Sequence, residues 1–209
     1  SLKAFPEQYK IAKQLSDTTY LKNLLASEQA AQGKWFSELG KSDLGRKTTP
    51  WFNPSVDDSS WSTYQLPSSF SEAGMDFKNG VVWFRKDIDL PENCSGKQAL
   101  LELGRIVDSD SVFINGKFVG TTGYQYPPRR YTVVPGILKA GKNNITVRVV
   151  SQSFSGAFIK EKPYQLTVEG QIIDLKGTWK YNIGAKCGPS PTSTFFPGKP
   201  LGLYNAMLS

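Results

Sequence analysis

The stretch from Val81 to Val150 constrains the fold of this chain more than any other part of the sequence. Three segments in it, VVWFRKDIDLP, LLELGRIVDSDSVFINGKFVG and YTVVPGILKAGKNNITVRVV, alternate apolar and polar residues. Alternation with a period of two predicts strands that bury one face. Asn115 and Gly116 lie between the apolar runs of the second segment, and both tolerate the positive φ of a type I′ hairpin turn. We therefore expect a core made of strands.

Two later segments extend this pattern. Residues 164–169 and 179–183 also alternate, and turns rich in Gly, Pro and Asn separate the strands. From Thr48 to about Gly184 no helical pattern longer than a turn intervenes, which argues against a parallel sheet with helical crossovers. Many short strands joined by such turns are typical of a β-sandwich.

The first forty residues differ from the rest and predict helices. Phe5 and Tyr9 begin an apolar repeat at spacings of four and three residues within 2–39. Asp17 is the expected N-cap of a second helix, which should end at Gly40. A linker rich in charge and glycine follows up to Lys47.

Composition narrows the classes of partner and of chemistry. The net charge is +7, but Lys and Arg are spread along the chain, whereas nucleic-acid-binding proteins gather them on one face or helix. No apolar run approaches the roughly 20 residues of a membrane span. We therefore expect neither a nucleic acid nor a membrane as partner.

Histidine is absent, so a Ser-His-Asp mechanism has no base within this chain. No cofactor is expected.

Two pairs of residues raise the question of disulfide and metal chemistry. Cys94 and Cys187 fit no metal-ligand spacing, and we expect two separate thiols, with a disulfide as the alternative. Asp108 and Asp110 lie two positions apart in a predicted strand and should share a face. Such a pair can ligate calcium or act as the two carboxylates of a self-contained glycosidase. Between these possibilities we favour a structural role beside the hairpin, in which the side chains bond to the local backbone.

The residues that we consider for glycan binding lie in loops. Trp61 and Trp83 belong to strand-like segments and are expected to fill the core. Loops carry binding groups more often than strands do, and aromatic and guanidinium groups suit sugar rings and carboxylates. The candidates for contact with a glycan or with a neighbouring domain are Trp51, Tyr124, Tyr126, Arg129 and Arg130. For the two arginines we favour a salt bridge, within this domain or to a neighbouring one.

The order of the strand segments resembles the galactose-binding-like jelly roll of many carbohydrate-active enzymes, including the sugar-binding domain of β-galactosidase-type glycosidases. The flanking segments GYQYPPRRY (123–131), LKGTWKYNIG (175–184) and PLGLYNAML (200–208) are similar to bacterial sialate O-acetylesterases. In that family a jelly roll is inserted into an SGNH-type hydrolase domain. The head, residues 2–10, looks like the exit from the first catalytic segment.

This resemblance implies a mainly β fold, a jelly-roll sandwich with a short helical N-terminal segment. It implies a non-catalytic insert that braces the SGNH-type catalytic domain of the same polypeptide, in a periplasmic or secreted carbohydrate esterase. The family's catalytic Ser and His blocks are absent, so the chain alone should be inactive. The alternative is an autonomous carbohydrate-binding module for sialylated or other glycans. The implied regions are a helical segment and linker from the seam with the catalytic domain (1–47), the jelly roll (48–184) and a Pro/Gly-rich returning connection (185–209).

If the helical head comes from a seam with another domain, its apolar stripe is left partly uncovered. We expect Phe5, Tyr9, Leu21 and Leu25 to pack incompletely and to promote self-association. Residues before about Gly40 and after about residue 184 should then exchange their amide protons faster than the strands.

Overall fold

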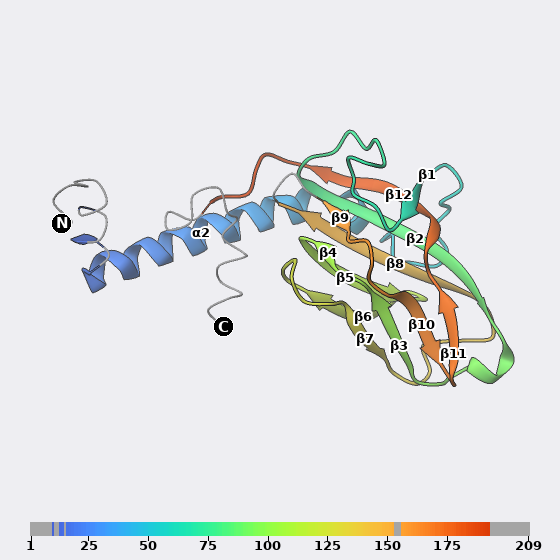
Figure 1. The fold of residues 1–209 in the computed structure, drawn as a ribbon. Coiled ribbons are helices and arrows are strands. Elements are labelled where there is room, and N and C mark those ends of the chain that lie inside the picture. The colour runs from blue at the N-terminus through green and yellow to red at the C-terminus, as the bar shows by residue number, and fades with distance from the viewer. Residues whose placement is uncertain (1–9, 11–12, 15, 153–155, 193–209) are drawn as a thin grey trace.

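The computed structural model describes residues 10, 13–14, 16–152 and 156–192. Phe5, Tyr9 and the tail beyond 192 lie outside these residues. Within the described part the fold is mainly β, as expected, with one long helix ahead of the sandwich (Figure 1). None of the described helices is both long enough and apolar enough to cross a bilayer.

All strand pairs in the described chain are antiparallel. The larger sheet has the order β1-β12-β2-β8-β5-β6. Its strands are β1 (Ser62–Leu66), β12 (Gly177–Lys186), β2 (Gly80–Leu90), β8 (Gly141–Ser151), β5 (Ser109–Ile114) and β6 (Lys117–Thr122).

The smaller sheet has the order β11-β10-β3-β7 and covers one face of the larger one. Its strands are β11 (Gln171–Asp174), β10 (Tyr164–Val168), β3 (Ala99–Leu103) and β7 (Arg130–Val133). A two-stranded sheet joins β4 (Ile106–Val107) to β9 (Ala157–Phe158), and a short 3-10 helix, η3 (Glu92–Cys94), precedes β3.

The main core lies between the two sheets. Val82 and Phe84 of β2 point into it from the larger sheet, and Leu101 and Leu166 point into it from the smaller one. The alternation predicted for residues 81–90 is confirmed there. The opposite face of β2 carries Trp83, Arg85 and Asp87, so this face defines the outer surface of the larger sheet.

The helix α2 (Thr18–Ser42) begins where the sequence predicted. The side chain of Asp17 accepts hydrogen bonds from the backbone N–H groups of Thr19 and Tyr20, which confirms the N-cap. The helix continues two residues past Gly40 and points away from the sandwich, touching it only near its C-terminal end (Figure 1). Within α2, all of which the structure describes, Leu39 is the one buried residue.

The segment expected as a linker after the helix is docked on the sandwich. Asp43 is fully buried, and a short 3-10 helix, η2 (Leu44–Arg46), follows it. The linker prediction missed this because Asp43 finds buried partners on the larger sheet, the indole of Trp83 and the guanidinium of Arg148. A polar residue with such partners can be buried without a large penalty.

Two smaller predictions are confirmed. Asn115 and Gly116 have φ values of 51° and 80°, as the predicted hairpin turn requires. Cys94 and Cys187 are separate free thiols, the first buried and the second half-buried.

Candidate functional site

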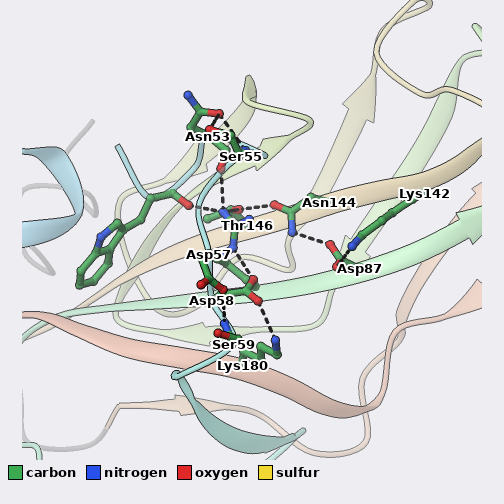
Figure 2. A network of polar contacts seen from close by, with 12 residues as sticks. Asn53, Ser55, Asp57, Asp58, Ser59, Asp87, Lys142, Asn144, Thr146 and Lys180 are labelled. Carbon is green, nitrogen blue, oxygen red and sulfur yellow. Dashed lines mark hydrogen bonds and ion pairs between the residues drawn. The ribbon is translucent and has the colours of Figure 1, made fainter. Parts of the chain in front are cut away.

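A polar cleft of about 420 Å³ lies on the outer face of the larger sheet. Strand register creates it. In the pairing of β12 with β2, Lys180 lies opposite Arg85, and in the pairing of β2 with β8, Asp87 lies opposite Asn144. Because side chains two apart on a strand share a face, these polar groups gather on one surface. Figure 2 shows the resulting network together with the loop that runs over it.

Arg85 forms the buried base of the cleft. Its side chain is 2% exposed, and its Nε donates to Oδ2 of Asp58 at 2.8 Å. Its Nη1 donates to the backbone carbonyls of Trp51 and Asn53. One side chain therefore fastens the loop of residues 51–58 to the sheet.

Asp58 connects this base to the open part of the cleft. Its Oδ1 accepts a hydrogen bond from Nζ of Lys180 at 2.7 Å. Burial opposes ionisation of Asp58, but the hydrogen bonds from Lys180 and Arg85 outweigh it and hold the carboxyl pKa below its usual value. Asp58 is therefore a carboxylate at neutral pH and has no proton to donate.

The second half of the cleft is more open. Asp87 accepts hydrogen bonds from Nδ2 of Asn144 and Nζ of Lys142, each at 2.8 Å. Asp87 and Lys142 keep 42% and 72% of their side-chain surface exposed. The hydrogen bond and charge of Asp87 raise the pKa of Lys142, so the ammonium stays charged. Both groups can exchange one partner for a ligand without being extracted from the interior.

Exposed donors and acceptors on a shallow surface suit the binding of hydroxyl or carboxylate groups better than bond cleavage. Hydrolysis of a glycoside needs a protonated acid beside a second carboxylate, and Asp58 is held ionised by its cationic partners. The described residues contain no cluster of three or more metal-ligating side chains. We therefore treat the cleft as a binding site.

Sequence reasoning missed this cleft. The alternation of β2 places Arg85 and Asp87 on its polar face, but Asp58, Lys142 and Lys180 come from distant segments. The run of charged residues facing outward from this long strand was the one available signal.

Trp51 lies next to the cleft but belongs to a second apolar cluster on the same sheet face. It is half-buried, and its ring packs edge-on against Trp61 with centroids 5.0 Å apart. Trp83 is fully buried in this cluster, and Trp61 is partly buried beside it. The core role predicted for Trp83 is confirmed, while Trp51 presents its carbonyl rather than its ring to Arg85.

Arg129 is buried inside the domain. This corrects the prediction of a contact with a glycan or another domain and confirms the salt bridge favoured for it, because its side chain is fully buried and its Nε lies 2.6 Å from Oδ1 of Asp110. Its two terminal nitrogens donate to the carbonyls of Pro127 and Asp108. A buried guanidinium needs all of these partners. Arg129 therefore has a structural role and joins Asp110 to the backbone at Pro127 and Asp108.

The other predicted residues of this loop stay near the surface. Tyr126 is 50% exposed, whereas Tyr124 is half-buried. Arg130 has a 59% exposed side chain with its Nε 3.7 Å from Oε1 of Glu102. None of the three lines the cleft.

Asp108 and Asp110 have the structural role that the sequence favoured, although they do not lie on one strand as predicted. Both are buried, and β5 starts only at Ser109, so the two do not share one strand. The carboxylate of Asp108 accepts from the backbone N–H of Gln152 at 2.7 Å. Asp110 accepts from Arg129 and from the hydroxyl of Tyr131. Their oxygens serve internal contacts, which corrects both the calcium and the catalytic interpretation in favour of the structural one.

Comparison with known proteins points to glycoside hydrolases. Residues 18–182 match the family model described as "Glycosyl hydrolases family 2, sugar binding domain". A β-glucuronidase of Formosa agariphila is 27% identical over 105 residues, which cover 44% of this chain and 11% of that protein. The chain thus spans about a tenth of the length of this curated relative.

Two solved structures that are similar to this chain are also described as β-glucuronidases. A Bacteroides uniformis β-glucuronidase has a TM-score of 0.47 and 22% identity, with coverage of 67% of this chain and 16% of that one. A Ruminococcus gnavus β-glucuronidase has a TM-score of 0.44 and 15% identity, with coverage of 67% and 26%.

These matches correct the parent that the flanking segments suggested. The sialate O-acetylesterase assignment was wrong, because the matched family and the named relative are glycoside hydrolases and not carbohydrate esterases. The resemblance of the strand segments to the sugar-binding domain of glycosidases is confirmed, since the family model covers them all. The chain belongs to the sugar-binding domain family of family 2 glycosyl hydrolases.

Proposed function

We propose that this domain binds glycan on behalf of a glycoside hydrolase whose catalytic residues lie elsewhere in the same polypeptide. The named relative is a β-glucuronidase, and the proposed substrates are accordingly glucuronides. The observation that carries the proposal is the open pair of Asp87 and Lys142, which sits beside a rigid, buried Arg85–Asp58 base. The proposed location is the periplasm or the outside of the cell.

The cleft offers complementary groups for a sugar. Lys142 and Lys180 can donate to hydroxyl or carboxylate oxygens, and Asp87 can accept from a hydroxyl. Among the described residues, none that lines the cleft is aromatic, so binding would rely on hydrogen bonds that compete with water. We expect an affinity in the millimolar range, about −4 kcal/mol, which suits a site that positions a substrate rather than captures it.

Nuclear magnetic resonance titration of the 209-residue chain with methyl β-D-glucuronide and methyl β-D-glucoside tests the proposal. Saturable shifts of the amides around Asp87 and Lys142 are expected, and Lys142→Ala should weaken them. Lys186→Ala is the matched control, because Lys186 forms a similar exposed ion pair with Asp76 at 3.0 Å outside the cleft. Equal effects of both substitutions, or no saturable shift in the cleft, would rule out this site.

A further inference from the structure

A second feature lies at the far end of the β5–β6 hairpin from the cleft. Asn115 lines the cleft at the turn of this hairpin. The loop after Thr122 begins at the opposite end, about 20 Å away for strands of six residues. Tyr126 lies in that loop, and Arg105 lies beside it. The two residues are therefore separate from the proposed cleft.

Arg105 has an unused hydrogen-bond donor. Its Nε is buried and, within the described residues, is the one buried side-chain polar atom without a hydrogen-bond partner. Buried donors of folded proteins are almost always paired, and an exception calls for an explanation. An acceptor atom supplied by a bound ligand is one explanation, and the residues around Arg105 support it.

The backbone around Arg105 is held on both sides. Its carbonyl accepts from the N–H of Ile159 at 2.9 Å. The preceding Gly104 donates to the carbonyl of Pro163 and accepts from the N–H of Arg129, at 2.9 Å and 2.7 Å. The backbone of Arg105 is therefore fixed, and only its side chain has to be ordered when a ligand binds.

Tyr126 presents an aromatic ring next to this guanidinium. The ring centroid lies 5.9 Å from Cζ of Arg105, and the residue is 50% exposed. The loop that carries it is braced from within, because the buried Arg129 donates to the carbonyl of Pro127 at 2.7 Å while paired with Asp110. The ring is thus an exposed apolar surface on a supported loop.

We propose that Arg105 and Tyr126 form a binding site for a pyranose that bears a carboxylate. The apolar C–H face of the sugar would lie on the ring of Tyr126, and the carboxylate would accept from the guanidinium of Arg105, whose side chain would turn to bring the buried Nε within reach of the ligand. One guanidinium matches the single charge of a carboxylate. The site stands independently of the cleft, since the two share no residue.

Titration of the whole chain with methyl β-D-glucuronide, methyl β-D-glucoside and inorganic phosphate tests this site by amide shifts. The glucuronide should shift the amides of residues 104–105 and 123–129 and should bind more tightly than the glucoside. Tyr126→Ala should lower the affinity for the glucuronide by about tenfold, the size of one lost contact of this kind. Arg105→Gln should abolish the preference for the glucuronide over the glucoside.

Phe118→Ala is the matched control, because Phe118 is an aromatic residue with 58% exposure elsewhere on the hairpin. It should leave the affinity unchanged. Equal binding of glucuronide and glucoside, shifts confined to the cleft, or saturation of this site by phosphate alone would overturn the proposal. These three outcomes are measured on the wild-type protein, so they test the proposal even if a variant fails to fold. Because the amide shifts are assigned to residues, they also show whether this site or the cleft fails to bind.

Discussion

Asp43, just after the long helix, and Trp83, in the middle of the larger sheet, are joined by a buried hydrogen bond of 2.8 Å from the indole Nε1 to Oδ1. The other carboxylate oxygen accepts from Nε of Arg148, also at 2.8 Å. The backbone N–H of Gly45 donates to Oδ1 as well. A single carboxylate thus joins the helix end, the following turn and two strands.

Removal of this carboxylate should be costly. Asp43→Ala leaves the mostly buried guanidinium of Arg148 and the indole N–H of Trp83 without this acceptor, and we expect the free energy of unfolding to fall by about 3–5 kcal/mol. Urea denaturation measures it. Arg46→Ala is the control, since its pair with Asp43 is long, 3.9 Å, and its side chain is 53% exposed. Similar losses in both variants would contradict the anchoring role.

Gly45, beside this anchor, and Gly33, in the projecting helix, should respond in opposite directions to alanine. A Cβ at Gly45 would lie 2.3 Å from Nε1 of the buried Trp83, so Gly45→Ala should destabilise the fold. Gly33 lies within α2, and a Cβ added there would meet nothing within 4 Å. Gly33→Ala should therefore stabilise by about 0.5–1 kcal/mol through helix propensity. Thermal unfolding of both variants distinguishes steric exclusion from a general effect of glycine.

The parts of the fold that sequence could predict were local. Alternation identified the faces of β2, and local side-chain chemistry identified the N-cap at Asp17 and the turn at Asn115. The partners of charged residues depend on register and on loop paths, which no short pattern encodes. A salt bridge was expected for Arg129, but its partner could not be named because Asp110 lies nineteen positions earlier, in β5. The polar cleft escaped notice for the same reason.

The Arg129–Asp110 pair should behave as a coupled unit. Arg129→Met leaves a buried carboxylate without its cation, and we expect a loss of about 3–5 kcal/mol in the free energy of unfolding. The double variant with Asp110→Leu should lose less than the sum of the two single variants, because neither charge then remains alone. Arg130→Met is the neighbouring control, with a 59% exposed side chain, and should change stability little. Additive losses would show that the pair is not coupled.

An exposed ion pair supplies a test of pH dependence. Hydrogen bonds from Lys160 and Ser69 lower the pKa of Glu72 to about 2 from an ordinary value of 4.5. Because the folded-state pKa is the lower one, this pair stabilises the fold above about pH 4.5, and its contribution is lost as the pH falls towards 2. Lys160→Ala should raise the Glu72 pKa in a carboxyl-detected titration. Lys186→Ala, which removes a pair with Asp76, should leave it unchanged.

The last prediction concerns the helix that projects from the sandwich. Leu39 is the one buried residue of α2, a helix described throughout, whereas Leu21, Leu25 and Trp35 are only half-buried. A helix without a covering layer gains little from packing, so amides of residues 18–38 should exchange faster than those of β2 and β8.

The boundary expected near residue 184 should shift outward. Strand β12 reaches Lys186, and the N–H of Cys187 donates to the carbonyl of Asn79 at 3.1 Å. Amide protection should therefore extend to about Cys187.

The half-buried leucines of α2 should also promote self-association, which Leu21→Glu combined with Leu25→Glu should reduce in sedimentation velocity. Protection of residues 18–38 equal to that of the strands, in a monomer at all concentrations, would show that the apolar stripe of the helix is already covered.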